Sequence, residues 1–145
     1  MTKALTLWQP WASLIAWDEK KIETRCWATR HRGPLLIHAA KRPFKLESFA
    51  ENRHYVDVFR RREILKPEDL PLGCIVARAE LKACIPTSID YAHAVYEDDP
   101  AEYSFGDFSE GRYAWVLENI MALPEPIPVR GGQGLWTYIP KPQPE

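Results

Sequence analysis

The amino-acid sequence predicts an α+β fold built from several short strands. Its 145 residues include 46% hydrophobic and 12% aromatic side chains, enough for one domain with a substantial core. The predicted strands do not alternate regularly with helices, which argues against a sheet made of repeated βα units. Short strands with a few interspersed helices are instead typical of an α+β sheet or a small β-barrel.

The N-terminal segment is predicted to form a strand followed by a short helix. Residues 5–8 have the composition of a strand. Pro10 fits the first turn of a helix, where its missing N–H would have no partner in any case. Apolar side chains recur at helical spacing from Trp11 to Ile15, so we expect a helix of about two turns that ends near Asp18.

Residues 21–27 are predicted to form a strand with one charged face. Successive side chains of a strand point to opposite faces, so Lys21, Glu23 and Arg25 should lie together. The other face then carries Ile22, Thr24 and Cys26. We therefore expect a strand whose charged side is available to a ligand and whose back packs on the core.

The rest of the chain is read from the same patterns. Residues 73–84 form the clearest strand, because small and aliphatic side chains alternate with charged ones. Residues 97–110 are strongly acidic and are predicted to be a loop. The other expected elements are a strand at 34–40, a charged helix at 44–65 that allows an interruption, a helix at 88–96, and strands at 112–117 and 134–139, joined through Pro124, Pro126 and Pro128. The tail, residues 140–145, is expected to be frayed.

Positive and negative charges nearly cancel over the whole chain, but they are unevenly distributed along it. The formal net charge of −1 argues against a protein that holds long nucleic acids mainly through phosphate contacts. Residues 1–66 contain 14 Lys and Arg against 7 Asp and Glu, whereas residues 67–145 contain 5 against 13. This asymmetry allows a basic face that binds a short RNA or a nucleotide.

No disulfide framework, metal site or cofactor is predicted. Cys26, Cys74 and Cys84 are an odd number without a CxxC pair, and the four histidines lack the spacing of metal ligands. We interpret all three cysteines as structural, Cys26 as a small buried strand residue. His38 is expected to form hydrogen bonds within the fold.

No membrane segment is predicted either. The longest apolar stretch, from Trp11 to Trp17, is too short to span a bilayer, and the N-terminus does not resemble a secretory signal. We expect a cytoplasmic protein, and the sequence leaves its oligomeric state open.

A charged motif lies between two groups of tryptophans. Lys20, Lys21, Glu23 and Arg25 fall within six residues, flanked by Trp8, Trp11, Trp17 and Trp27. Cations beside flat aromatic rings suit an aromatic, anionic or carbonyl-bearing ligand, such as a nucleobase with its phosphate. The alternative interpretation is a lattice of exposed ion pairs, each contributing about 0–1 kcal/mol.

The same segment resembles the signature of the ASCH family, a branch of the PUA-like superfamily. That signature, G-x-K-x-x-E-x-R, matches residues 18–25 at Lys20, Glu23 and Arg25, with Asp18 in place of the glycine. Aspartate tolerates the positive φ that a glycine turn would require. Further similar segments are WQPWASLI, RGPLLIHAAK, FGDFSEGRYAWVLENI and GGQGLW. The resemblance implies one ASCH domain over residues 1–145, a PUA-like β-barrel with flanking α-helices and the motif in a cleft.

The resemblance makes the motif the candidate site. Lys20 is a candidate phosphate or carbonyl partner, or a base, and Glu23 could accept from an exocyclic amine or move a proton. These two are the candidate catalytic residues. Arg25 offers a fixed two-pronged donor. The other candidate ligand-binding residues are Trp8, Trp11, Ser13, Trp27 and Lys41.

Three functions stay open at this point. The leading one is binding of RNA or a modified nucleoside in the cleft. The second is hydrolysis. One branch of the family removes the acyl group from N4-acetylcytidine with a threonine where Glu23 stands, so a route here would use water activated by Glu23. Metal-independent RNA cleavage is the other hydrolytic route, and Asp107 or Glu110 is the candidate remote carboxylate. The third is a protein-interaction module that engages a partner through its basic N-terminal half.

Overall fold

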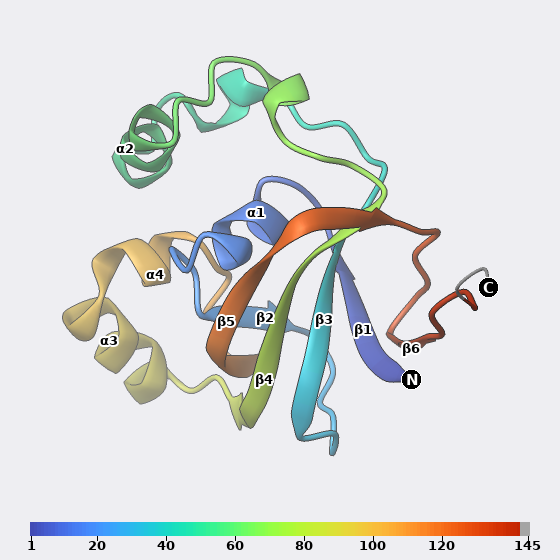
Figure 1. The fold of residues 1–145 in the computed structure, drawn as a ribbon. Coiled ribbons are helices and arrows are strands. Elements are labelled where there is room, and N and C mark those ends of the chain that lie inside the picture. The colour runs from blue at the N-terminus through green and yellow to red at the C-terminus, as the bar shows by residue number, and fades with distance from the viewer. Residues whose placement is uncertain (143–145) are drawn as a thin grey trace.

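The computed structural model describes residues 1–142 and contains a mixed six-stranded sheet with flanking helices (Figure 1). The predicted α+β class is confirmed. The strands are β1 (Thr2–Leu7), β2 (Ile22–Arg25), β3 (Gly33–Ala39), β4 (Cys74–Pro86), β5 (Tyr113–Pro128) and β6 (Leu135–Tyr138), in the order β2-β5-β4-β3-β1-β6. The helices are α1 (Trp11–Ala16), α2 (Arg53–Arg61), α3 (Ile89–Asp98) and α4 (Pro100–Ser104), with 3-10 turns η1 (Leu46–Phe49) and η2 (Pro67–Asp69).

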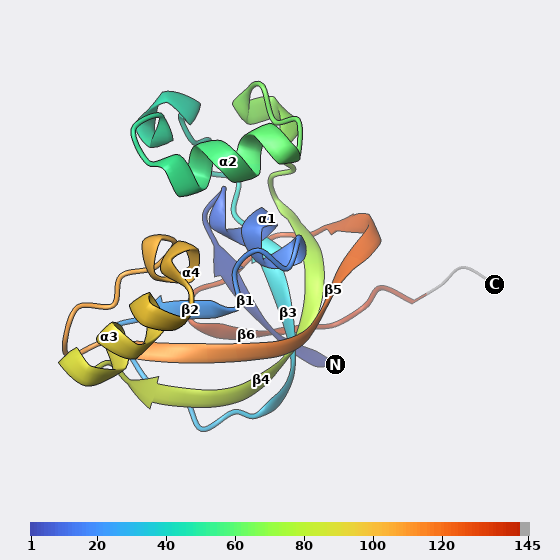
Figure 2. The ribbon, with the colours of Figure 1, turned by 90° about the vertical axis from the view of Figure 1, so that its left-hand side faces the viewer.

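The sheet is curved, and its ladder of strands does not close into a barrel (Figure 2). β1 runs parallel to β3, and every other pair is antiparallel. Among residues 1–142 no ladder joins the edge strands β2 and β6, so the closed barrel is not confirmed. A side chain links β2 to β1 instead, because Arg25 Nη2 at the end of β2 donates to Thr6 O of β1 at 2.8 Å.

Helix α1 is short and lies between two hydrophobic clusters. Its Ala12 and Ile15 belong to the main core on the sheet, which includes the fully buried Trp115. Its Leu14 belongs to a second cluster with Tyr55 and other side chains of α2. A six-residue helix is marginal in isolation, so packing on both sides must stabilise α1. Pro10 occupies the N-cap position, one residue before the predicted place in the first turn.

Two arginines attach α2 to the turn after α1. Arg61 Nη1 lies 2.6 Å and Arg62 Nη2 3.3 Å from Glu19 Oε1, and Arg62 Nη2 also donates to Trp17 O at 3.0 Å. The hydrogen bond from Arg61 holds the pKa of Glu19 below its ordinary value. Arg61 and Arg62 at the end of α2 therefore have a structural role, since they hold α2 over α1.

Two predictions in the C-terminal half were wrong. The acidic segment predicted as a loop contains α4, which begins after Asp99, whose side chain accepts from Glu102 N at 3.2 Å. An N-cap aspartate followed by a proline is a helix start signal that favours this helix. In addition, β5 continues through the proline segment to Pro128. After Leu117 its only strand partner in the described chain is β4, and an edge strand tolerates prolines.

The C-terminal tail is only partly described. Residues 140–142 are exposed and lie outside any strand. The remainder of the predicted frayed tail, residues 143–145, lies outside the described residues.

His38 connects β3 to β1 and to the segment before β6, as its predicted hydrogen bonding required. Its Nε2 lies 2.7 Å from Val129 O, which can only accept, so Nε2 carries the proton. Its Nδ1 lies 3.2 Å from Thr6 Oγ1 and accepts the hydroxyl proton, while Thr6 Oγ1 accepts from Trp136 Nε1 at 3.0 Å. Burial lowers the pKa of His38, which favours this neutral form.

We expect the fold to lose stability on acidification because of His38. Its pKa in the folded state is below the ordinary value of 6.5, so its contribution is complete above pH 6.5. That contribution is lost as the pH falls from 6.5 towards the folded pKa, because the unfolded chain binds a proton that the folded chain does not. The free energy of unfolding of wild type and His38→Gln, measured with urea between pH 7.5 and 5.5, should show a smaller pH dependence in the variant. His54→Gln is the control, and equal pH dependence in all three proteins would contradict the role of His38.

Candidate functional site

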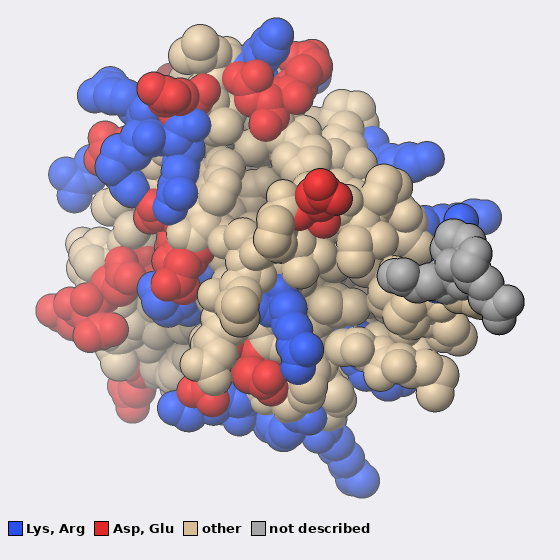
Figure 3. All heavy atoms as spheres, viewed as in Figure 1, with Lys and Arg blue, Asp and Glu red and all other residues tan. Residues whose placement is uncertain are grey.

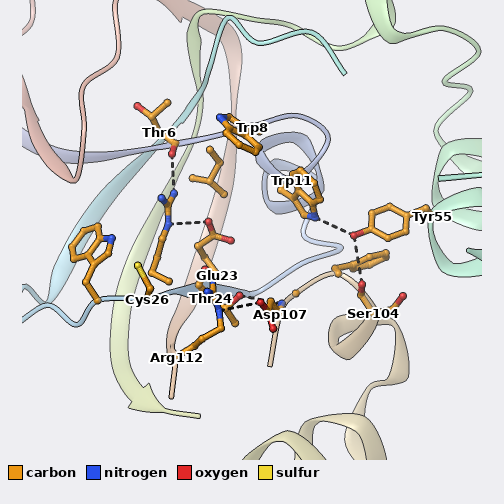
Figure 4. Close-up of a pocket in the computed structure, with 15 residues that line it drawn as sticks. Thr6, Trp8, Trp11, Glu23, Thr24, Cys26, Tyr55, Ser104, Asp107 and Arg112 are labelled. Atoms are coloured by element: carbon orange, nitrogen blue, oxygen red, sulfur yellow. Dashed lines mark hydrogen bonds and ion pairs between the residues drawn. The ribbon is translucent and has the colours of Figure 1, made fainter. Parts of the chain in front are cut away.

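A cavity of about 520 Å³ lies where β2 and β1 diverge (Figure 4). Its volume falls within the range of small-molecule sites, roughly 300–1,000 Å³. Four parts of the chain build it: the end of β1 with the start of α1, strand β2 with the residues after it, helix α2, and the segment from α4 to the start of β5. The lining residues are Thr6, Leu7, Trp8, Trp11, Glu23, Thr24, Arg25, Cys26, Trp27, Tyr55, Ser104, Phe105, Gly106, Asp107 and Arg112.

Glu23 and Arg25 both face the cavity, as the alternation along β2 predicted. Glu23 Oε2 lies 3.1 Å from Arg25 Nε as an ion pair without hydrogen-bond geometry. The side chains are 14% and 25% exposed, so both are reachable by a ligand. The cavity therefore presents a hydrogen-bond acceptor, the Glu23 carboxylate, beside the Arg25 guanidinium, which has several donors. Lys21, predicted on the same face, is half exposed outside the cavity, with Nζ 3.3 Å from Asp18 O.

The motif lysine lies in the interior and not among the lining residues. Lys20 has no exposed surface, and its Nζ donates to Ile22 O and, at 3.1 Å, to Phe105 O. Glu23 Oε1 is 4.0 Å from the same nitrogen. Burial lowers the pKa of Lys20, and the negative charges of Glu23 and Glu102 oppose that shift. Lys20 is thus a cation that stabilises the negative charge of Glu23 from the interior, and it does not reach a phosphate in the cavity.

The turn at Asp18 directs Lys20 inward. Asp18 has a φ of 61°, in the left-handed region that the glycine of the family signature adopts without strain. The backbone N–H groups of Glu19 and Lys20 both donate to Leu14 O, which fixes the chain reversal after α1. Aspartate is among the few residues that tolerate this conformation.

The buried carboxylate near Lys20 is Glu102, which the sequence analysis missed. Its Oε1 accepts from Lys21 N at 2.6 Å, and Oε2 has no hydrogen-bond partner among the described residues. Burial raises the pKa of Glu102, and Lys20 opposes that shift. The one sequence signal was the start of α4, which places Glu102 in the first turn of a helix.

The two carboxylates considered from the sequence lie elsewhere. Asp107 lines the cavity, where its side chain accepts from Ser109 and lies 3.5 Å from Arg112 Nε. The hydrogen bonds from Ser109 lower the pKa of Asp107. Glu110 is exposed and lines a separate pocket beside α3.

Aromatic side chains form much of the wall. Trp8 is 51% exposed, and the Arg42 guanidinium lies 3.7 Å from the centre of its ring. Trp11 Nε1 donates to Tyr55 OH at 3.0 Å. Trp27 packs edge-on against the buried Trp115, with ring centres 4.7 Å apart. Tyr55 was not predicted, because nothing in the local sequence of a charged helix indicates which distant segment it will contact.

Three residues do not have the position or the surroundings that the sequence predicted for them. Ser13 is buried in α1, where its hydroxyl accepts from Gln9 Nε2 at 2.7 Å, and it does not line the cavity. Lys41 lines a different cavity. Cys26 was predicted as a buried strand residue, and this was wrong: β2 ends at Arg25, and Cys26 is exposed at the cavity wall.

Among the described residues, one cavity hydroxyl is paired with a base, since Thr6 Oγ1 donates to His38 Nδ1, and none is paired with the charged residues of the motif. Thr24 Oγ1 accepts from Asp107 N at 3.1 Å, and Ser104 Oγ exchanges hydrogen bonds with Asn52. Among residues 1–142, no hydroxyl of the cavity is hydrogen-bonded to Glu23 or Lys20, whereas an activated nucleophile is typically within reach of a base. The described residues also contain no group of three His, Cys, Asp or Glu side chains suited to a metal ion. The arrangement is that of a polar cavity with an aromatic wall.

Comparison with known sequences decides the family. The sequence model of the ASCH domain matches residues 5–126. The chain belongs to the ASCH domain family. It is 29% identical over 133 residues to activating signal cointegrator 1 of Mus musculus, and 26% identical over 132 residues to the Homo sapiens protein. Each alignment covers 91% of this chain, which spans only 21% of the length of these relatives.

Solved ASCH structures share the fold. ASCH from Zymomonas mobilis superposes with a TM-score of 0.57 at 15% identity, covering 96% of this chain and 87% of that one. A point mutant of the same protein gives a TM-score of 0.57 and covers 90% of that chain. The described part of the present chain contains no helix that is long and apolar enough to cross a membrane.

Replacing Lys20 is expected to destabilise the fold. Lys20→Met should lower the free energy of unfolding by about 3–5 kcal/mol, because Glu23 and Glu102 lose a buried countercharge. Lys20→Met/Glu102→Gln should recover part of that loss, and the exposed Lys21→Met should change stability by less than about 0.5 kcal/mol. Urea denaturation measures all three. A Lys20→Met protein as stable as Lys21→Met would contradict the structural role of the buried ammonium.

Proposed function

We propose that this ASCH domain binds a nucleobase, either in RNA or in a modified nucleoside, in the cavity between β2 and β1. The observation that carries the proposal is the pairing of Glu23 with Arg25 inside an aromatic wall. A nucleobase combines flat faces with neighbouring donors and acceptors on its edge. This cavity offers a complement to both features.

The polar groups suit the edge of a base. An exocyclic amine can donate to the Glu23 carboxylate, and a ring carbonyl can accept from Arg25 or Arg112. Arg25 already donates to Thr6 O, and Arg112 Nη2 donates to Thr24 O at 3.2 Å, so both guanidinium groups are held in place before a ligand enters. Preorganised donors lose little entropy on binding.

The tryptophans suit the faces of a base. Stacking of a base on an aromatic side chain contributes roughly 1–3 kcal/mol without sequence preference. Trp8 is half exposed and lies beneath the guanidinium of Arg42. A cation at this ring can also contact the phosphate of the bound nucleotide. The relatives carry the matched domain as about a fifth of a longer protein, which fits a recognition module.

Hydrolysis is the second candidate, supported by the buried cation 4.0 Å from Glu23. Glu23 could take a proton from water, whose oxygen would then attack the acyl carbon of a bound N4-acylated cytidine or the phosphorus of a bound RNA. The bond from the acyl carbon to N4, or a P–O ester bond, would break, and the leaving nitrogen or oxygen would take the proton from Glu23. Lys20 is too deeply buried to contact that group, so it would act by supporting the charge of Glu23. Binding remains the better supported function, since no hydroxyl of the described cavity is hydrogen-bonded to Glu23 or Lys20.

Binding of nucleosides should depend on Trp8 and Glu23. With cytidine, N4-acetylcytidine and the four ribonucleoside monophosphates as ligands, Trp8→Ala should weaken the binding that wild type shows by roughly 5- to 150-fold, the value of one stacked base. Glu23→Gln should weaken it by about 10-fold or more through loss of a charge-assisted hydrogen bond. Isothermal titration calorimetry measures each affinity. Glu80→Gln on β4 is the matched control.

Two results would contradict the proposal. One is wild-type protein that binds none of these ligands, which would favour a protein-interaction module. The other is Trp8→Ala and Glu23→Gln variants with the affinity of Glu80→Gln. Mass spectrometry of the same mixtures tests the second candidate, because deacylated cytidine or cleaved RNA from wild type and not from Glu23→Gln would identify an enzyme.

A further inference from the structure

A second cavity, of about 920 Å³, lies on the other side of Thr6. It is formed by the ends of β1 and β3 and by the segment that connects β5 to β6. Its lining residues are Thr6, His38, Ala40, Lys41, Gly73, Pro128, Val129, Arg130, Gly131, Gly132 and Gln133. Thr6 lines both cavities, so the second one begins where the nucleobase cavity ends.

We propose that the ligand is a single-stranded nucleic acid whose phosphodiester backbone runs from the nucleobase cavity into this second cavity, where Lys41 and Arg130 bind its phosphates. This inference rests on the proposed function and extends it from a single base to a strand.

The charged side chains that line the second cavity favour a polyanion. Lys41 and Arg130 are exposed, and neither lies within 4.0 Å of an acidic side chain in the described chain. The lining of the cavity includes no Asp or Glu. By contrast, Arg78 and Lys82 on β4 lie near Glu80 and Glu118. Unpaired cations in an acid-free cavity attract a polyanion.

The backbone of the segment that connects β5 to β6 also suits a phosphate. A Cβ atom on Gly131 would lie 2.6 Å from His38 Cε1 and 2.7 Å from Thr6 Oγ1, so only glycine allows this close approach to the sheet. Within residues 1–142, the backbone N–H groups from Arg130 to Gln133 donate no hydrogen bond to another part of the protein. Free backbone donors beside cations are typical phosphate ligands.

The two cavities also adjoin, so one strand can pass from the first to the second. Lys41 lines the second cavity, and the next residue, Arg42, lies over Trp8 at the first. Consecutive Cα atoms are about 3.8 Å apart, so one short stretch of backbone supplies a cation to each cavity. A strand that stacks a base on Trp8 would pass Arg42 and then Lys41. Only an unpaired base can enter the first cavity, which favours a single strand.

The acidic surface lies elsewhere. Figure 3 shows Asp and Glu side chains gathered over α3 and α4, which Figure 1 places on the opposite side of the sheet from β6 and the C-terminus. This surface therefore does not offset the charge of Lys41 and Arg130 at the second cavity.

The test is fluorescence anisotropy with a labelled eight-nucleotide RNA, the DNA of the same sequence and the corresponding RNA duplex. Lys41→Ala/Arg130→Ala should bind both single strands at least 10-fold more weakly than wild type. The slope of log affinity against log salt should shrink by about 1.4, since each lost phosphate contact contributes about 0.7. Cytidine and N4-acetylcytidine should bind this variant as they bind wild type. Arg78→Ala/Lys82→Ala removes the same charge from β4 and should bind like wild type.

The outcomes separate the two proposals. Equal strand affinity and equal salt slope in the two double variants would overturn the phosphate path, even where Trp8→Ala still weakens nucleoside binding and so supports the nucleobase cavity. Strand binding that depends on Lys41 and Arg130 but not on Trp8 would support the second cavity and reject the first. A duplex that binds as tightly as the single strands would overturn the single-stranded ligand. Absence of any strand binding by wild type would overturn the path altogether.

Discussion

The buried ammonium of Lys20 is the interaction on which the rest of the site depends. It joins Ile22 of β2 to Phe105 at the end of α4, and lies close to Glu23 while the charge of Glu102 acts on it. A charge without water is costly unless hydrogen bonds and countercharges surround it. The segments that supply those groups are therefore held together by the same cation. Because Glu23 is one of the countercharges, the group that faces a ligand is positioned by the interior of the fold.

The gap in the sheet is the second constraint, and Thr6 is its central residue. Its carbonyl accepts from Arg25, which bridges β2 and β1. Its hydroxyl lies between His38 and Trp136 and so connects β1 to β3 and β6. A complete ladder between β2 and β1 would leave no room for a ligand. One guanidinium side chain joins β2 to β1 and leaves the cavity open between them.

The local sequence predicted those features that depend on neighbouring residues. Alternation along residues 21–27 placed Glu23 and Arg25 on one face. Of the tryptophans around the motif, Trp8, Trp11 and Trp27 line the same cavity. The positive φ of Asp18 agrees with the glycine of the family signature. What the sequence could not predict depends on distant contacts. Glu102 approaches Lys21 across 81 residues, and Tyr55 approaches Trp11 across 44. The burial of Lys20 also involves a distant segment, since its ammonium donates to Phe105 O across 85 residues, which no spacing within the motif reveals.

The most direct test of this account is the response of the six tryptophan indole N–H groups to a nucleoside, measured by two-dimensional nuclear magnetic resonance. Three tryptophans line the proposed nucleobase cavity, namely Trp8, Trp11 and Trp27, whereas Trp17 lies under Arg62 outside it. Added cytidine or N4-acetylcytidine should shift the three cavity resonances and leave that of Trp17 unchanged. Saturating shifts at Trp17 with none at Trp8, Trp11 and Trp27 would place the ligand elsewhere and contradict the assignment of this cavity as the site.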